Sequence, residues 1–208
     1  MSGKNLKSSL RENTEAIIIA IIIAVFIRAF IIQAFKIPSG SMLETLQIGD
    51  QILVNKFIYG VKLPFTDGKT IIPVNDPEKG DIIVFKYPED PSKDFIKRVI
   101  ATEGDTIEIV NKKLYVNDRL VENEPYAAYK NKNEIYPARL SARDNIPKII
   151  VPENKLFVMG DNRDNSHDSR FWGYVDIKAV RGKAFIIYWS WNKERFGVRW
   201  NRLGNIIK

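Results

Sequence analysis

The sequence predicts a mainly β domain, a barrel or a sandwich, behind one N-terminal membrane-spanning helix. A nearly continuous apolar run occupies positions 16–35 and is long enough to cross a bilayer. From position 37 onward the apolar segments are short, rich in β-branched residues and separated by Gly, Pro, Asn and Asp, which is typical of strands and turns. A chain of 208 residues has room for one such domain and a short appendage.

The apolar run reads AIIIAIIIAVFIRAFIIQAF, and only Arg28 and Gln33 in it are polar. About 20 helical residues rise about 30 Å, the thickness of the hydrocarbon core. Arg28 costs up to about 3.5 kcal/mol at a bilayer centre, but each isoleucine of the run contributes about −0.5 kcal/mol. Because Arg28 lies past the midpoint, its side chain can also reach the far interface. We therefore predict a transmembrane anchor over residues 16–35.

The leader over residues 1–15 carries Lys4, Lys7 and Arg11, and basic residues beside a span favour the cytoplasmic side. The rest of the chain is then exported. A cleavable secretory signal is one alternative, although the run exceeds the usual apolar core of about 7–15 residues and no small-x-small pair follows promptly. A buried core helix is a second alternative, which the lack of a polar face disfavours.

Composition removes several chemistries. The chain has no cysteine and one histidine, which excludes disulfides, thiol nucleophiles and a structural zinc on Cys and His ligands. The formal charge of +7 is compatible with a nucleic acid or a lipid surface as partner, and equally with the ordinary mixed-charge surface of a soluble domain.

The remaining chain is predicted to be organised as short strands. Candidate strands are residues 51–56, 81–86, 95–102, 106–110, 113–116, 155–159 and 180–189. The sequence VNDRL at 116–120 predicts a hairpin turn. Residues 122–147 are polar, aromatic and irregular, which indicates an insertion or a small subdomain.

The first block with chemical potential is IPSGSMLETLQIGD, residues 37–50. Ser39 lies between Pro38 and Gly40, and Ser41 follows directly. At least one of the two hydroxyls is therefore expected to be held on a rigid, exposed turn. Ser41-x-x-Glu44 is also a helix capping box, in which the Ser41 hydroxyl would only accept a backbone N–H. Both interpretations stay open from the residues alone.

The second block is DFIKRVIATEGD, residues 94–105. Strand alternation places Lys97 between Phe95 and Val99 on one face. If that face is buried, desolvation lowers the pKa of the lysine, so that it can accept a proton near neutral pH. Arg98 cannot do this, because a guanidinium does not deprotonate in proteins. The alternative is that Lys97 extends to solvent at a sheet edge.

The third block, GDNRDNSHDSRFWGYV at 160–175, is dense in Asp, Asn and Ser. A calcium loop starting at Asp161 would need other residues at Arg163, Ser166 and Trp172, so no metal site is predicted. Its acidic and basic side chains indicate an internally paired hydrogen-bond network. The segment KGDIIVFKYP at 79–88 is interpreted as supporting strand.

In this order after an anchor, the motifs PSGSM, GDIIVFKYP, FIKRVI and GDNRDNSHDSR-WG resemble the bacterial type I signal peptidases in patches from Phe35 to Val175. The resemblance implies that Ser41 is the nucleophile and Lys97 its general base. It implies that Ser39 lends its hydroxyl to the oxyanion hole and that Ser166 orients the lysine. Site-bracing positions by the same resemblance are Arg98, Asp161, Asp168 and Arg170. Substrate pockets fall on Phe35, Ile37, Met42, Leu46, Phe95 and Ile96. Glu44 and Glu103 stand where the family usually has proline.

The resemblance further implies a β-barrel-like catalytic core over residues 36–105 and 153–208, with a subdomain inserted at 106–152. The expected partners are signal-peptide-bearing exported precursors with an Ala-x-Ala site, paired as an added strand, and membrane lipid. Neither a cofactor nor nucleic acid is expected. The expected location is the inner (cytoplasmic) membrane, with a single span, a cytoplasmic N-terminus and the catalytic domain on the outer or periplasmic side.

Our hypothesis is therefore a Ser-Lys peptidase that acts through an acyl-enzyme. A Ser-His-Asp arrangement would have to use His167, the only histidine. A self-cleaving Ser-Lys peptidase is an alternative that would not normally begin with an anchor, and no DNA-reading helix is evident before Ser41. A catalytically silent β domain that binds exported chains is another. The C-terminal tryptophans 189, 191 and 200 fit an interfacial rim on lipid or a role in the core equally well.

Overall fold

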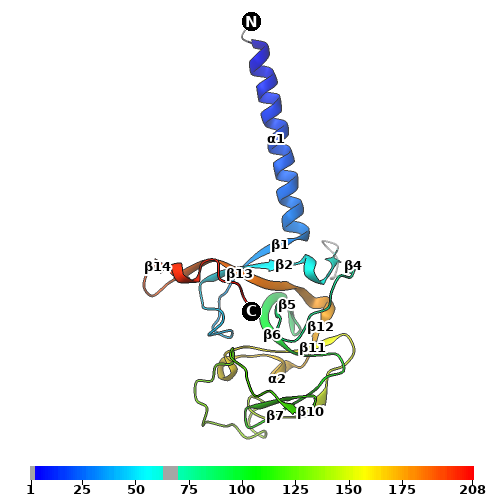
Figure 1. Cartoon of the computed structure of the whole chain (residues 1–208), viewed down its shortest axis with the longest axis vertical. Helices are drawn as coiled ribbons and strands as arrows, with labels where there is room; N and C mark the ends of the chain where they lie inside the picture. The colour runs from blue at the N-terminus through cyan, green and yellow to red at the C-terminus, as the bar shows by residue number, and fades with distance from the viewer. Residues whose placement is uncertain (1–2, 63–69) are drawn as a thin grey trace.

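The computed structural model of the protein describes residues 3–62 and 70–208 (Figure 1). A long helix, α1 (Gly3–Phe30), stands away from a mainly β domain, as predicted. Met1 and Ser2, the start of the predicted leader, lie outside the described residues. Within α1, Glu12–Phe30 is long and apolar enough to span a membrane, and none of it is buried. The alternative of a buried core helix is therefore wrong.

The predicted extent of the anchor helix is wrong at its C-terminal end. The helix ends at Phe30, and β1 (Ile32–Lys36) follows as a strand. It pairs antiparallel with β2 (Asp50–Asn55), from Ile32 opposite Asn55 to Lys36 opposite Gln51. Hydropathy did not separate the two elements, because an apolar run with isoleucine and phenylalanine suits a strand as well as a helix.

The main sheet has eight strands, seven in the order β1-β2-β13-β5-β6-β11-β12, with β14 paired to β13. Besides β1 and β2, this sheet contains β5 (Ile82–Tyr87), β6 (Asp90–Thr102), β11 (Lys155–Met159), β12 (Val175–Asp176), β13 (Val180–Asn192) and β14 (Gly197–Val198). Neighbouring strands in this sheet pair antiparallel. Its central strands β5, β6 and β11 are almost wholly buried over their apolar residues, and they carry the core of the domain.

A second sheet of four strands lies at the end of the domain farthest from α1 (Figure 1). Its order is β10 (Ile146–Ile150), β7 (Thr106–Val110), β8 (Lys113–Val116), β9 (Arg119–Leu120). All four strands come from the part of the chain in which an inserted subdomain is predicted. The domain boundaries themselves stay a prediction. A short pair, β3 (Val61–Lys62) and β4 (Thr70–Ile72), completes the described strands.

All seven predicted strand segments are strands in the structure. The bounds of β7, β8 and β11 match the prediction, whereas β6 and β13 are longer. The unpredicted strands are short, because two to five residues carry too little periodicity to be recognised. The predicted hairpin at VNDRL is confirmed between β8 and β9, where Asn117 and Asp118 have φ of 53° and 63°. Positive φ at both central residues is the requirement of a type I′ turn.

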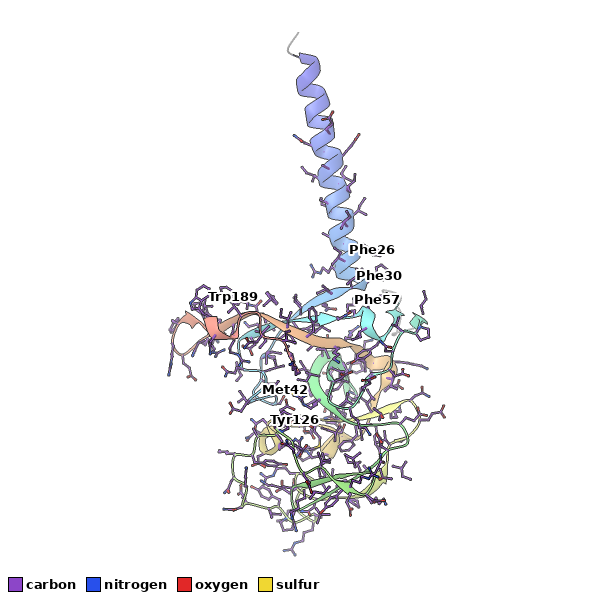
Figure 2. The ribbon with its side chains drawn as sticks, in the orientation of Figure 1. Phe26, Phe30, Met42, Phe57, Tyr126 and Trp189 are labelled. Carbon is purple, nitrogen blue, oxygen red and sulfur yellow. The ribbon has the colours of Figure 1, made fainter. Side chains whose placement is uncertain are left out.

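Short helices complete the chain at η1 (Phe57–Tyr59), η2 (Arg163–Asn165), α2 (Ser169–Trp172), η3 (Ile177–Ala179) and η4 (Trp200–Arg202). Figure 2 shows Phe26 and Phe30 on the last turns of α1, and Phe57 and Trp189 on the adjoining face of the domain. Trp200 is 72% exposed and Trp191 38% exposed, so a core role for these two tryptophans is wrong.

Candidate active site

The structure brings Ser41 and Lys97 together. Ser41 lies in the turns that connect β1 to β2, and Lys97 projects from β6. The Lys97 ammonium nitrogen Nζ is 2.8 Å from Ser41 Oγ and 3.0 Å from the carbonyl oxygen of Ile96. Residues 41–46 form turns and no helix, so the capping-box interpretation is wrong. Lys97 is 3% exposed, which also makes the sheet-edge alternative wrong.

The environment of Lys97 favours its neutral form. Burial lowers the pKa of Lys97 to about 8, which outweighs the opposing carboxylates of Asp168 and Asp161. The Arg170 guanidinium adds to the lowering. On the same strand face, the ring of Phe95 lies 5.4 Å from Nζ, as the strand alternation predicts. A lysine with this pKa is partly unprotonated near neutral pH, which a general base requires.

The backbone around Ser41 is held by the polar segment 160–162. The Asn162 N–H donates to the carbonyl oxygen of Ser41 at 3.1 Å, and its side-chain amide donates to that of Gly40 at 2.9 Å. Ser39 lies on the same turn, with its Oγ 3.5 Å from Ser41 Oγ. The hydroxyl groups of the two serines therefore lie side by side on this turn.

Gly160 allows the close approach of these two segments. A Cβ atom at this position would lie 2.2 Å from Ser166 Oγ and 2.4 Å from the carbonyl oxygen of Ser41. Neither contact is sterically allowed, so only glycine fits. Sequence reasoning missed both Gly160 and Asn162, because it weighed the charged residues of this block and not its backbone contacts.

Arg98 and Asp161 form a buried bidentate ion pair. Arg98 Nε and Nη2 each donate to one Asp161 oxygen at 2.8 Å, and the two side chains are 2% and 1% exposed. Thr45 Oγ1 donates to the same carboxylate at 2.5 Å, and the Tyr126 ring lies 3.9 Å below the guanidinium. This pair joins β6, which carries Lys97, to the turns after Ser41 and to the polar segment.

Asp168 and Arg170 form a second buried pair. Arg170 donates from Nε and Nη2 to the two carboxylate oxygens at 2.8 and 2.9 Å, and the Gly160 N–H donates at 3.0 Å. Burial raises the pKa of Asp168, but the Arg170 charge and these hydrogen bonds outweigh it and hold the pKa below its usual value. Ser166 is 6% exposed, and within the described part of the chain its hydroxyl makes no hydrogen bond to Lys97.

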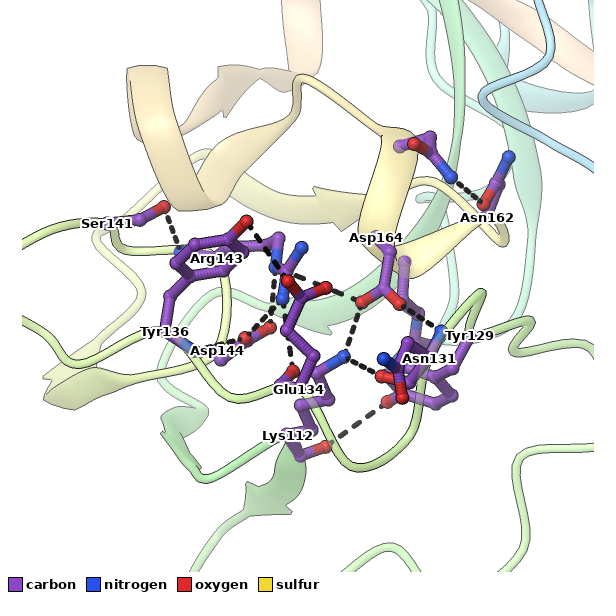
Figure 3. A network of polar contacts seen from close by, with 12 residues as sticks. Lys112, Tyr129, Asn131, Glu134, Tyr136, Ser141, Arg143, Asp144, Asn162 and Asp164 are labelled. Atoms are coloured by element: carbon purple, nitrogen blue, oxygen red, sulfur yellow. Dashed lines mark hydrogen bonds and ion pairs between the residues drawn. The ribbon is translucent and has the colours of Figure 1, made fainter.

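The same polar block is anchored to the segment that carries the second sheet (Figure 3). Lys112 Nζ donates to Asp164 at 2.7 Å and to the carbonyl oxygen of Asn131 at 2.8 Å. Arg163 Nη1 and Nη2 donate to Glu124 at 3.0 and 2.5 Å. Both pairs are almost fully removed from solvent. The predicted hydrogen-bond network therefore exists, and it extends beyond the block itself.

His167 does not take the place of a catalytic base in this geometry. Its Nε2 lies 3.3 Å from the hydroxyl oxygen of Tyr87, and its ring stacks on Phe171 at 5.3 Å between centroids. Among the described residues, the side-chain partner of Ser41 Oγ other than Ser39 is Lys97. The arrangement is a Ser-Lys pair, and the Ser-His-Asp alternative lacks its central hydrogen bond.

A cavity of about 480 Å³ opens onto the Ser-Lys pair. It is lined by Pro38, Ser39, Gly40, Ser41, Asp94, Phe95, Ile96, Lys97, Asn162, Asn165 and His167. Of the six predicted pocket residues, Phe95 and Ile96 are in this lining. Met42 and Leu46 are fully buried, and Phe35 packs with Ile37 in the same apolar cluster. A larger cavity of about 630 Å³ lies beside Tyr126 and does not contain the Ser-Lys pair, so size alone does not identify the site.

Glu44 and Glu103, at the positions where the resemblance leads us to expect proline, both lie in turns. Glu44 lies in the turns after Ser41, and Glu103 accepts a hydrogen bond from the Asn154 N–H at 2.8 Å. The latter contact ties the β6–β7 turn to the start of β11.

Comparison with known proteins gives consistent matches. The model of a protein family described as "Signal peptidase, peptidase S26" matches residues 10–189. The signal peptidase I of Pseudomonas aeruginosa is 39% identical over 79% of this chain and 67% of the relative. That of Pseudomonas fluorescens is 41% identical with the same coverage, and that of Aquifex aeolicus is 36% identical over 87% of this chain and 85% of the relative. A crystal structure of a signal peptidase I from Enterococcus faecalis aligns with 52% of this chain and 97% of its own, at 32% identity and a TM-score of 0.42.

Proposed function

The chain belongs to the signal peptidase I family, the S26 serine peptidases that remove signal peptides, and from this premise we propose that Ser41 and Lys97 form its catalytic pair. The observation that carries the proposal is the 2.8 Å contact between Lys97 Nζ and Ser41 Oγ inside a cavity open to substrate. The lowered pKa of Lys97 supports the direction of proton transfer, from serine to lysine.

The reaction has two halves. Neutral Lys97 takes the Ser41 proton as Oγ attacks the scissile carbonyl carbon, and the carbonyl oxygen becomes an oxyanion. The Ser41 N–H and the Ser39 hydroxyl donate hydrogen bonds to that oxyanion. The C–N bond then breaks, the leaving amine takes the proton from Lys97, and an ester remains on Ser41. Lys97 next deprotonates a water molecule that attacks this ester, which releases the signal peptide and restores the serine.

The buried pairs act as positioning elements for this chemistry. Asp161 with Arg98, and Asp168 with Arg170, fix the polar block against the Ser41 turn and against β6. Their carboxylates also limit how far burial lowers the pKa of Lys97. Ser166 packs against Gly160 beside the Ser41 backbone, and its hydroxyl orients the lysine once the amine is neutral.

The substrates follow from the family, which acts on signal-peptide-bearing precursors. We propose that a precursor with an Ala-x-Ala site adds as a strand beside the cavity, with its small side chains toward Phe95 and Ile96 in the lining. The apolar cluster that contains Phe35, Ile37, Met42 and Leu46 supports the cavity from within the core. The core over residues 36–105 and 153–208 then performs catalysis, and the insertion at 106–152 supports it.

We propose a single-pass orientation with the N-terminus in the cytoplasm and the catalytic domain outside the inner membrane. The unburied apolar helix supports the span, and the basic residues of the leader support its direction. Trp191 and Trp200 are exposed, and they suit the membrane interface as the aromatic rim that the sequence left open. Bilayer contacts of labels placed beside these residues test this seating, and labels that stay in water would overturn it.

The test of the catalytic proposal is precursor cleavage by Lys97→Met in the detergent-solubilised full chain. Loss of a general base lowers the rate by roughly 100-fold to 10,000-fold. The matched control is Lys155→Met, which removes a half-exposed lysine paired with Asp176 and should change cleavage little. Near-normal cleavage by Lys97→Met would reject the proposal, and no cleavage by the wild-type chain would favour a catalytically silent β domain that binds exported chains. Cleavage of the chain itself with an untouched precursor would favour a self-cleaving peptidase.

A further inference from the structure

The only histidine of the chain lies in the wall of the active-site cavity, and the proposed mechanism gives it no role. His167 lines the cavity together with Ser41, Lys97 and Asp94. Its ring is oriented by two aromatic neighbours, Phe171 by stacking and Tyr87 edge-on at 6.3 Å between centroids. A polar ring held in a substrate cavity without a part in proton transfer is a candidate for substrate recognition.

The hydrogen bonds around Tyr87 determine which imidazole nitrogen faces the substrate. The Tyr87 hydroxyl has one proton and donates it to the Glu89 carboxylate. Its oxygen can therefore only accept from His167 Nε2, 3.3 Å away. Nε2 must carry the hydrogen, and in the neutral ring Nδ1 is then an unprotonated acceptor. Among the described residues no hydrogen bond occupies Nδ1.

The charges beside the ring favour the same kind of ligand. Asp94 lines the cavity, and its 29% exposed carboxylate accepts a hydrogen bond from Arg181 Nε at 3.2 Å in an ion pair, so one of its oxygens keeps free acceptor capacity. Glu89 lies behind Tyr87. Among the described residues that line the cavity, the one lysine is Lys97, which is uncharged in its active form. The cavity thus presents hydrogen-bond acceptors at His167 and Asp94, and the Arg181 guanidinium offsets the Asp94 charge.

We propose that His167 and Asp94 form a specificity subsite that takes a hydrogen-bond-donating side chain of the precursor beside the scissile bond. The chemical class is an amide, hydroxyl or basic side chain, and an ionised carboxylate is disfavoured there because it has no proton to donate to these acceptors. This inference rests on the proposed function, and it adds a preference to the requirement for small residues at the Ala-x-Ala positions.

The test uses one Ala-x-Ala precursor in which each position flanking the cut carries Gln, Leu or Glu in turn. Cleavage is measured as kcat/KM at pH 8.5, where imidazole side chains are in general neutral. At one position the wild-type chain prefers Gln over Leu by about threefold to tenfold, which corresponds to one net hydrogen bond. It cleaves the Glu precursor more slowly than both. In His167→Leu the Gln preference disappears, with the change mainly in KM.

Tyr87→Phe is the second variant, because it keeps the imidazole and removes the hydroxyl that fixes its tautomer. The Gln preference should weaken in this variant and persist in the matched control Tyr136→Phe, which removes a hydroxyl that contacts Glu134 away from the cavity lining. A wild-type chain without any Gln preference, or a preference that survives His167→Leu, would overturn the inference while cleavage itself continued. Failure of the wild-type chain to cleave any of the precursors would instead count against the proposed function.

Discussion

Titration of Lys97 should govern the pH dependence of cleavage. Its pKa is lowered from 10.5 to about 8 by burial. With one controlling group of this pKa, about a tenth of the molecules hold neutral Lys97 at pH 7 and about nine tenths at pH 9. The value of kcat/KM should therefore rise about tenfold between these two pH values and level off above them.

The assay is the initial rate of precursor cleavage at substrate concentrations well below KM, from pH 6 to 10 at constant ionic strength. Under this condition the profile reports the free enzyme. The expected curve has a slope of about one decade per pH unit below pH 8. A flat profile, or a midpoint above 10, would refute the reasoning, because burial would then not control the base.

The same shift has a consequence for folding. Below pH 8 both the folded and the unfolded chain protonate Lys97, so its burial as an ammonium opposes folding. Between pH 8 and 10.5 the folded chain has released this proton and the unfolded chain still holds it. The free energy of unfolding should therefore gain about 3 kcal/mol from this group across that window. Denaturant titrations of wild type and Lys97→Met test it, since the variant should lack this gain.

Four further substitutions, one of them a control, test the parts that hold the site. Asp161→Asn leaves the buried Arg98 guanidinium without its charge partner. It should lower the free energy of unfolding by about 3–5 kcal/mol in urea titrations, and a loss below about 1 kcal/mol would contradict the structure. Gly160→Ala forces the Ser41 backbone away from its position and should reduce kcat roughly 100-fold in a folded protein. A wild-type kcat in this variant would contradict the requirement for glycine at this position. Lys112→Met breaks a pair that is 7% and 4% exposed, and Lys148→Met one that is 48% and 68% exposed. Lys112→Met should lower the free energy of unfolding by about 3–5 kcal/mol and Lys148→Met by under about 1 kcal/mol. Equal losses would contradict the view that the buried Lys112–Asp164 pair anchors the polar block.

The sequence was informative where a local pattern sets the structure. Alternation along β6 placed Lys97 beside Phe95, and the order of the motifs placed Ser41 opposite it. Strand segments with several β-branched residues were found, as was the Asn-Asp hairpin turn. For the strands, the turn and the face of Lys97 the deciding interactions lie within a few neighbouring residues, whereas the pairing of Ser41 with Lys97 across 56 positions was expected only from the family resemblance.

The parts that were missed depend on contacts between distant segments. The anchor helix ends at Phe30 because the next residues pair with β2, and hydropathy carries no information on that pairing. Asn162 holds the Ser41 turn across 121 positions of the chain, and Gly160 is required only because that turn comes within 2.4 Å of where its Cβ would lie. Backbone contacts of this kind leave no periodic signal in the sequence.

The role of Ser41 as the nucleophile is tested most directly by trapping the acyl-enzyme. The full chain is mixed with an Ala-x-Ala precursor, quenched in acid within one turnover and analysed by mass spectrometry of its fragments. The fragment that contains Ser41 should gain the mass of the signal peptide as an ester, and Ser41→Ala should show neither the adduct nor cleavage. Cleavage by Ser41→Ala at the wild-type rate would contradict the mechanism.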